Sequence, residues 1–301
     1  MGTWRDDLEG WLAPFVAALG HKTRGRMCPA YVAGLNGPGD RKNVQPMAAR
    51  DGVVSYDQLH HFIADGVWDS APLEAALLAE ADRLVGGDEA FLVIDDTCLP
   101  KKGDRSVGVA PQYASSLGKT ANCQSLVSLT LASGEVPVMV GLRLFLPETW
   151  TGDPDRMARA RVPEDRQIAL SKPEIAIAEI DRVRAAGVRF GCVLADAGYG
   201  SSGPFRHALS TRGLAWAVGL SRRQKVYEPD RVYRRAKSSE GKLWKRETLG
   251  TVFRQRCAHV RCAWSWRMKR ITNHDRRRLL RSQSLLWLPP MKQEISDPVG
   301  K

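Results

Sequence analysis

Two aspartates, Asp96 and Asp196, have surroundings that suit metal-ion chemistry. Each comes at or just after the end of a short apolar run, residues 90–94 (AFLVI) and 190–195 (FGCVLA). Such runs predict buried strands, and ligands of open α/β sheets bind at the carboxyl ends of strands. Two carboxylates that converge there suit Mg²⁺ or Mn²⁺. Such ions can activate water and stabilise the leaving oxygen in phosphodiester cleavage.

The neighbouring Asp95 competes with Asp96 for the first position of this site. Successive side chains of a strand face opposite sides of the sheet, so only one of the two can point into the site while the strand continues. A simpler interpretation of a strand-end aspartate is a turn cap, because Asp side chains hydrogen-bond the backbone that follows. Two such aspartates occur in this basic chain. Taken together, they support the metal-site interpretation and the turn-cap interpretation equally.

A basic loop follows the first aspartate and carries Lys101, Lys102 and Arg105. These side chains could hold the scissile phosphate or the flanking backbone, and a solvated loop is the equally supported alternative. The whole chain has 45 Lys and Arg against 33 Asp and Glu, a formal net charge of +12. An excess of this size favours an anionic partner, with nucleic acid ahead of an acidic membrane surface.

Glycines mark the segment behind the second aspartate. Gly198, Gly200 and Gly203 match the pattern G-x-G-x-x-G of dinucleotide-binding turns. The first acid downstream, Glu228, lies in a polar stretch instead of at a strand end, so we interpret the glycines as a sharp turn behind Asp196.

The elements that must position these residues fall into two parts. Apolar residues at helical spacing predict a small all-helical domain over residues 1–86. We expect its helices at residues 4–19, 29–35, 57–64 and 72–84, with a glycine-containing basic break at 20–26. From residue 87 the pattern predicts strand, strand, strand, helix, strand, helix, strand, which is typical of an α/β layered fold. These elements are expected at 90–94, 125–132, 136–145, 173–186, 190–195, 205–212 and 215–219.

The remainder of the chain is polar and basic. Residues 221–255 are interpreted as the start of a β-rich insertion within a domain that covers residues 87–261. Residues 262–301 form a basic, atypical tail that we expect to be poorly ordered. No run approaches the ~18 apolar residues that span a membrane, and no signal peptide opens the chain. We therefore expect a cytoplasmic protein without a membrane partner.

Three motifs in this order resemble insertion-sequence transposases of the Asp-Asp-Glu type. The first combines residues 40–47 (DRKNVQPM) with 57–63 (DQLHHFI) and 67–69 (VWD) in the helical region. The second is residues 92–97 (LVIDDT) followed by 100–103 (PKKG), and the third is residues 194–200 (LADAGYG). Together they cover about residues 25–225, and their order is specific to this class of protein.

The resemblance implies a ribonuclease H-like mixed sheet with flanking helices, preceded by the helical DNA-binding domain. It implies that Asp96 and Asp196 are catalytic and hold Mg²⁺ or Mn²⁺, and the motif favours Asp96 over Asp95. It also implies cut-and-paste transposition on double-stranded DNA, with terminal inverted repeats and target DNA as partners. Arg41 and Lys42 of the first motif would contact DNA, and a homodimer in the DNA complex is left open.

One part of the pattern is missing. Transposases of this type place a catalytic Glu on a helix after the second Asp, within the motif Tyr-x-x-Arg-x-x-x-Glu-x-x-x-x-x-x-Lys. None of the later glutamates has these surroundings, namely Glu228, Glu240, Glu247 and Glu294. We therefore expect a C-terminally truncated or frameshifted member with impaired catalysis. The alternative is a non-catalytic remnant that binds DNA at inverted repeats.

Overall fold

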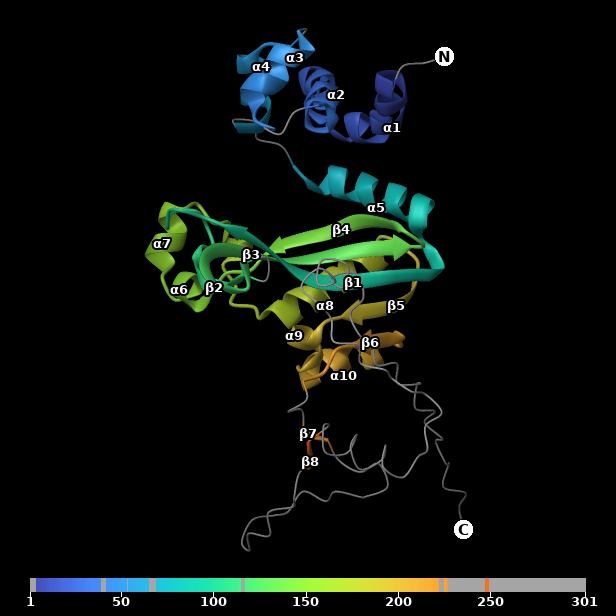
Figure 1. Ribbon diagram of the computed structural model, residues 1–301, viewed down its shortest axis with the longest axis vertical. Coiled ribbons are helices and arrows are strands. Elements are labelled where there is room, and N and C mark those ends of the chain that lie inside the picture. Colours follow the sequence, from blue (N-terminus) through green and yellow to red (C-terminus); the bar gives the residue numbers. More distant parts are fainter. Residues whose placement is uncertain are drawn as a thin grey trace, which may run out of the picture.

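The computed structural model describes residues 4–38, 42–52, 54–64, 69–114, 117–221, 225–226 and 247–248. A six-stranded mixed sheet forms the centre of the described part (Figure 1). Its hydrogen-bonded order is β2 (Ala110–Ala114), β3 (Lys119–Ser133), β1 (Gly87–Pro100), β5 (Phe190–Ala195) and β6 (Trp216–Val218). Strand β4 (Val136–Leu144) pairs with the second half of β3.

The strand directions define the fold. Strand β3 is antiparallel to β1 and β4, whereas β1, β5 and β6 are mutually parallel. Helix α8 (Lys172–Ala185) connects β4 to β5, and helix α10 (Gly203–Thr211) connects β5 to β6. Parallel neighbours need such crossover helices. The topology confirms the predicted ribonuclease H-like mixed α/β fold.

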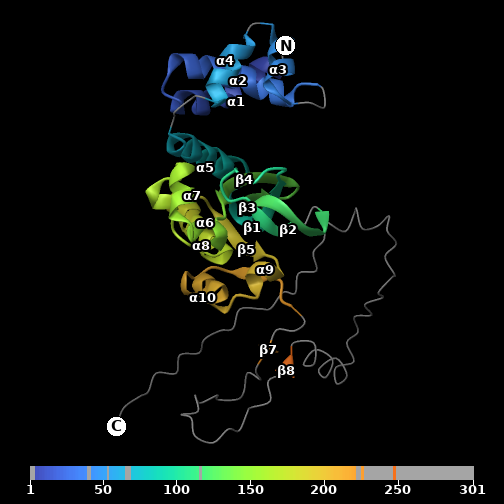
Figure 2. The same ribbon diagram turned by 90° about the vertical axis from the view of Figure 1, so that its left-hand side faces the viewer.

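One face of the sheet carries the core. Leu92 and Ile94 of β1 are buried together with Ile180 of α8 and Leu78 of α5 (Ala71–Val85). Helices α5 and α8 accordingly lie on the same side of the sheet (Figure 2). Phe91, which alternates with these core residues along β1, is 44% exposed. The described part of the chain therefore leaves the opposite face of β1 open.

Charged groups fasten helix α5 to the sheet. Arg143 of β4 donates hydrogen bonds to Glu74 of α5 at 2.6 Å and to Glu179 of α8 at 2.7 Å. At the other end of α5, Asp82 accepts from the Arg189 backbone and side chain. Helix α5 thus packs with the sheet, while the domain boundary at residue 86 stays a prediction.

Helices α1 to α4 form a separate cluster beyond α5 (Figure 1). Their bounds are α1 (Trp4–Ala18), α2 (Lys22–Asn36), α3 (Val44–Asp51) and α4 (Tyr56–Ala64). The predicted break at residues 20–26 is shorter than expected, because the chain leaves the helical conformation only at residues 19–21 and α2 begins at Lys22. A side chain at Gly25 would meet Val16 at 3.1 Å, so this glycine serves close helix packing instead of a break. Helix α3 was not predicted.

Short elements complete the described part of the chain. Between β4 and α8 lie α6 (Glu148–Thr151), α7 (Pro154–Arg159) and the 3₁₀ turn η2 (Glu164–Arg166). Within the predicted β-rich insertion, β7 (Lys225–Val226) pairs antiparallel with β8 (Glu247–Thr248). The predicted tail at residues 262–301 lies outside the described residues. No helix among the described residues has the length and apolar character needed to cross a membrane.

Candidate active site

Strand β1 carries Asp95 and Asp96 inside it, not at its end. The sequence indicated that the strand ends at these aspartates, but backbone pairing with β3 continues from Asp95↔Ser128 to Pro100↔Cys123. Because the strand continues, the two side chains face opposite sides of the sheet. Whether Asp95 or Asp96 belongs to the site therefore depends on which face of the sheet carries the site.

Asp96 faces the same side as Ile94, toward the helices. Its Oδ2 accepts a hydrogen bond from the Lys172 ammonium at 2.6 Å, and its Oδ1 accepts one from the Tyr199 hydroxyl at 2.6 Å. The side chains of Lys172 and Asp96 are 25% and 30% exposed. Both carboxylate oxygens of Asp96 are thus engaged by side chains of this chain.

Asp95 faces the other side, and the strand register brings it to Asp196. Strands β1 and β5 are parallel, with Ile94 opposite Ala195 on the core face. Asp95 and Asp196 are the next residues of the two segments, and Asp196 keeps an extended backbone with φ −77° and ψ −177°. Side chains at matched positions of adjacent strands share a face. Asp95 and Asp196, not Asp96 and Asp196, therefore form the adjacent pair.

Electrostatics agree with this placement. Partial burial of the Asp95 carboxyl group raises its pKa, and the negative charges of Asp196 and Asp96 raise it further. The Asp96 backbone N–H opposes the shift by donating to Asp95 Oδ1 at 2.8 Å. A cation bound beside Asp95 would relieve this repulsion, because it stabilises the ionised form of the Asp95 carboxyl group.

Asp196 also acts as the cap of helix α9 (Ala197–Gly200). Its Oδ1 accepts from the backbone N–H groups of Gly198 at 2.9 Å and Tyr199 at 3.3 Å. The turn lies directly on the end of β6, since a Cβ on Gly200 would come within 2.0 Å of the Gly219 carbonyl oxygen. The metal-site and turn-cap interpretations of Asp196 are therefore compatible, because both of these hydrogen bonds use Oδ1 and neither uses Oδ2.

The basic loop, residues 101–105, is held in place by its neighbours. Asn122 Nδ2 donates to the carbonyl oxygens of Lys101 at 3.1 Å and Gly103 at 2.8 Å. Arg156 donates to the Asp104 carbonyl oxygen at 3.0 Å, and its guanidinium lies 3.9 Å from the Trp150 ring centre. Lys102 and Arg105 are exposed and Lys101 is half-buried. The loop thus presents cations from a fixed backbone, just beyond the end of β1.

The basic pair of the first motif is only partly described. Arg41 lies outside the described residues. Lys42 is exposed and donates to the carbonyl oxygen of Gly37, the residue that ends helix α2. Lys42 lies between helices α2 and α3, so its expected role in DNA binding concerns the helical cluster.

A third carboxylate does not join Asp95 and Asp196 within the described residues, where no group of three or more potential metal ligands occurs. Of the later glutamates only Glu247 falls within them, in strand β8. Glu228, Glu240 and Glu294 lie outside.

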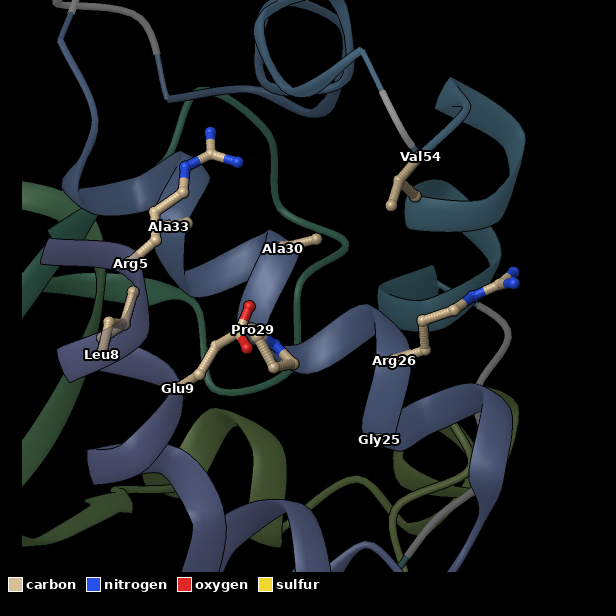
Figure 3. Close-up of a pocket in the computed structure, with 9 residues that line it drawn as sticks. All are labelled: Arg5, Leu8, Glu9, Gly25, Arg26, Pro29, Ala30, Ala33 and Val54. Carbon is tan, nitrogen blue, oxygen red and sulfur yellow. The ribbon is translucent and has the colours of Figure 1, made fainter. Parts of the chain in front are cut away.

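A pocket in the helical cluster does not bring its two arginines together. It measures about 410 Å³ between α1 and α2 (Figure 3). The side chains of Arg5 and Arg26 point in different directions there and do not converge on one ligand. The pocket is lined by Arg5, Leu8, Glu9, Gly25, Arg26, Pro29, Ala30, Ala33 and Val54.

Sequence reasoning missed Lys172 and Tyr199. Lys172 lies 76 positions from Asp96 and Tyr199 lies 103 positions from it, so local spacing gave no sign of either contact. The available signals were the helix start at Ser171 and the tyrosine inside the LADAGYG motif.

Comparisons with known proteins agree with the family that the sequence motifs indicated. The chain matches the family described as DDE superfamily endonuclease over residues 14–274. It is 31% identical over 185 residues to the "Probable transposase for insertion sequence element IS701" of Microchaete diplosiphon. That alignment covers 60% of this chain and 44% of the relative, so the chain spans less than half of that protein's length.

Proposed function

Because the chain belongs to the DDE superfamily endonucleases, we propose that it acts in the transposition of an insertion sequence. The reaction would be metal-dependent cleavage of phosphodiester bonds at the element ends, followed by strand transfer into target DNA. The observation that carries this proposal is the adjacency of Asp95 and Asp196 on the open face of the sheet. The likeness to a transposase over 60% of the chain supports the same reaction.

We assign the metal-binding pair to Asp95 and Asp196. The sequence motif favoured Asp96 and Asp196, but the Asp96 carboxylate is engaged by Lys172 and Tyr199 on the other face. Carboxylate oxygens fit hard cations such as Mg²⁺ and Mn²⁺. When bound, such an ion would supply water activation and charge stabilisation at the leaving oxygen.

Double-stranded DNA is the proposed partner, at the terminal inverted repeats and at the target. The exposed cations Lys102 and Arg105, with Lys101 beside them, lie just beyond the β1 end and suit contacts to backbone phosphates. Lys42 would add a phosphate contact from the helical cluster, and Arg41 is proposed as a further DNA contact from the sequence motif alone. The net charge of +12 favours this partner and predicts binding that weakens as salt rises.

The test is cleavage of DNA that carries the element's inverted-repeat ends by the purified chain. We expect nicking and strand transfer in Mg²⁺ or Mn²⁺, none after chelation, and none by Asp196→Asn at equal DNA affinity. Cleavage that persists in the chelator would overturn the metal-dependent mechanism.

A non-catalytic DNA-binding remnant is the second candidate function. It is favoured by the lack of a third carboxylate beside Asp95 and Asp196 within the described residues. This candidate predicts specific binding to inverted-repeat ends without cleavage in either metal, and identical binding by Asp196→Asn. The same experiment therefore separates the two functions.

A further inference from the structure

A continuous chain of hydrogen bonds joins the two aspartates assigned to the metal. The Asp96 backbone N–H donates to Asp95 Oδ1 at 2.8 Å, and the Asp96 carboxylate accepts from the Tyr199 hydroxyl at 2.6 Å. The Tyr199 backbone N–H then donates to Asp196 Oδ1 at 3.3 Å. Asp96 and Tyr199 thus each touch one of the two aspartates and also touch each other.

Lys172 fixes the same network from a third element. Its ammonium lies 2.6 Å from Asp96 Oδ2 and 5.4 Å from the centre of the Phe145 ring. Lys172 is the first residue of helix α8, whose start is fixed by a capping box. In that box Ser171 Oγ accepts from the Glu174 N–H, and Glu174 accepts from the Ser171 N–H at 2.7 Å. Because the start of α8 is fixed, the ion pair between Lys172 and Asp96 holds β1 at a set position relative to α8.

Tyr199 is equally well fixed. It is 3% exposed, and its ring lies 5.8 Å from that of Phe205. The Tyr199 hydroxyl donates its hydrogen bond to Asp96 Oδ1 at 2.6 Å. A buried donor that lost its acceptor would be left unsatisfied, which makes this contact costly to break.

We propose that Asp96, Lys172 and Tyr199 are positioning residues that form a clamp behind the metal-binding pair. The clamp ties β1 to the starts of α8 and α9, and so sets the separation of Asp95 and Asp196. This inference rests on the proposed function. It gives Asp96 a role other than metal binding and adds Lys172 and Tyr199 to the residues on which the site depends.

The direction in which Lys172→Met changes metal affinity distinguishes this role from direct metal binding by Asp96. If Asp96 were a ligand, the Lys172 ammonium would compete with the metal, and Lys172→Met would strengthen metal binding. If Asp96 belongs to the clamp, Lys172→Met loosens the site and weakens binding. Outer contacts of this kind change metal affinity by about tenfold or more.

The experiment measures Mn²⁺ binding to the full chain without DNA, by calorimetry and by the electron paramagnetic resonance of free Mn²⁺. We expect Tyr199→Phe and Lys172→Met to bind Mn²⁺ about tenfold more weakly than the unaltered chain. Asp95→Asn is expected to abolish binding. Tyr113→Phe is the matched control, because Tyr113 is 65% exposed and its hydroxyl has no role in the clamp. Thermal unfolding of each variant shows that the fold is retained.

Two results would overturn the clamp and leave the proposed function standing. The first is unchanged Mn²⁺ affinity in folded Tyr199→Phe and Lys172→Met. The second is stronger binding by Lys172→Met together with loss of binding in Asp96→Asn, which would make Asp96 the ligand. Failure of the unaltered chain to bind Mn²⁺ would contradict both the clamp and the metal-dependent function. Should Tyr199→Phe not fold, Lys172→Met and Asp96→Asn still decide the outcome.

Discussion

Asp95 lies beside Asp196 on the open face of the sheet, one position beyond the paired residues Ile94 and Ala195. The adjacent Asp96 points to the opposite face and is bound by Lys172 and Tyr199. Two consecutive aspartates of one strand therefore have different surroundings.

The turn behind Asp196 has no room for a side chain at Gly200. A Cβ there would lie 2.0 Å from the Gly219 carbonyl oxygen, so Gly200→Ala must displace α9 from β6. We expect a loss of about 2 kcal/mol in the free energy of unfolding, measured with urea, and weaker Mn²⁺ binding. Gly10→Ala is the control, since a Cβ at Gly10 meets nothing within 4 Å, and it should be neutral or slightly stabilising. Equal stability of the two variants would contradict the close packing.

The buried charge of Glu179 depends on Arg143. Glu179 is 6% exposed, and Arg143 links it to Glu74 of helix α5. Arg143→Met removes this link and leaves Glu179 with Arg182 alone, so we expect unfolding to become easier by about 2 kcal/mol. Arg83→Met is the control, because the Arg83 side chain is 61% exposed in its pair with Glu80, and it should change stability by less than about 1 kcal/mol. Urea unfolding measures both.

The Glu74 carboxylate makes the free energy of unfolding depend on pH. The hydrogen bond from Arg143 lowers the pKa of Glu74, and the charges of Arg143 and Arg182 lower it further. A lowered pKa gives a stability contribution that is present above the unfolded pKa of about 4.3 and is lost as the pH falls through the folded value. We expect the unfolding free energy of Glu74→Gln to fall less between about pH 5 and pH 3 than that of the unaltered chain. An identical slope would contradict the pairing, and Glu135→Gln in the exposed β3–β4 turn is the control.

The basic loop should contribute to DNA affinity through charge. Lys102→Ala and Arg105→Ala are each expected to weaken binding and to reduce the slope of log affinity against log salt by about one. Fluorescence anisotropy over a salt series measures both effects. Arg184→Ala is the control, because Arg184 is exposed near the end of α8, far along the helix from Lys172. Equal slopes for all three variants would show that the loop does not contact DNA.

Several elements could be predicted from the sequence because their signals are local. The apolar runs at 90–94 and 190–195 indicated β1 and β5, and Pro173 indicated the start of α8. The resemblance motifs indicated the mixed fold, which the strand topology confirms. Helix α3 was missed because it is short and carries Pro46 in its first turn, so it has little apolar period.

The face of each aspartate could not be predicted from the sequence. The run at residues 90–94 is apolar at every position, so it has no alternation that would show which face is buried. The length of β1 depends on pairing with β3, and the partner of Asp95 depends on the register with β5. Both are long-range contacts. The assignment of Asp95 therefore required the structure, and the same is true of Lys172 and Tyr199.

The cleavage rates of inverted-repeat DNA by Asp95→Asn and Asp96→Asn test directly which of the two aspartates holds the metal. If Asp95 and Asp196 hold the metal, Asp95→Asn loses several kcal/mol of transition-state stabilisation, or about a thousandfold in rate. Asp96→Asn then keeps measurable cleavage and needs about tenfold more Mn²⁺. The reverse order, with Asp95→Asn active and Asp96→Asn inactive at any Mn²⁺ concentration, would contradict the assignment.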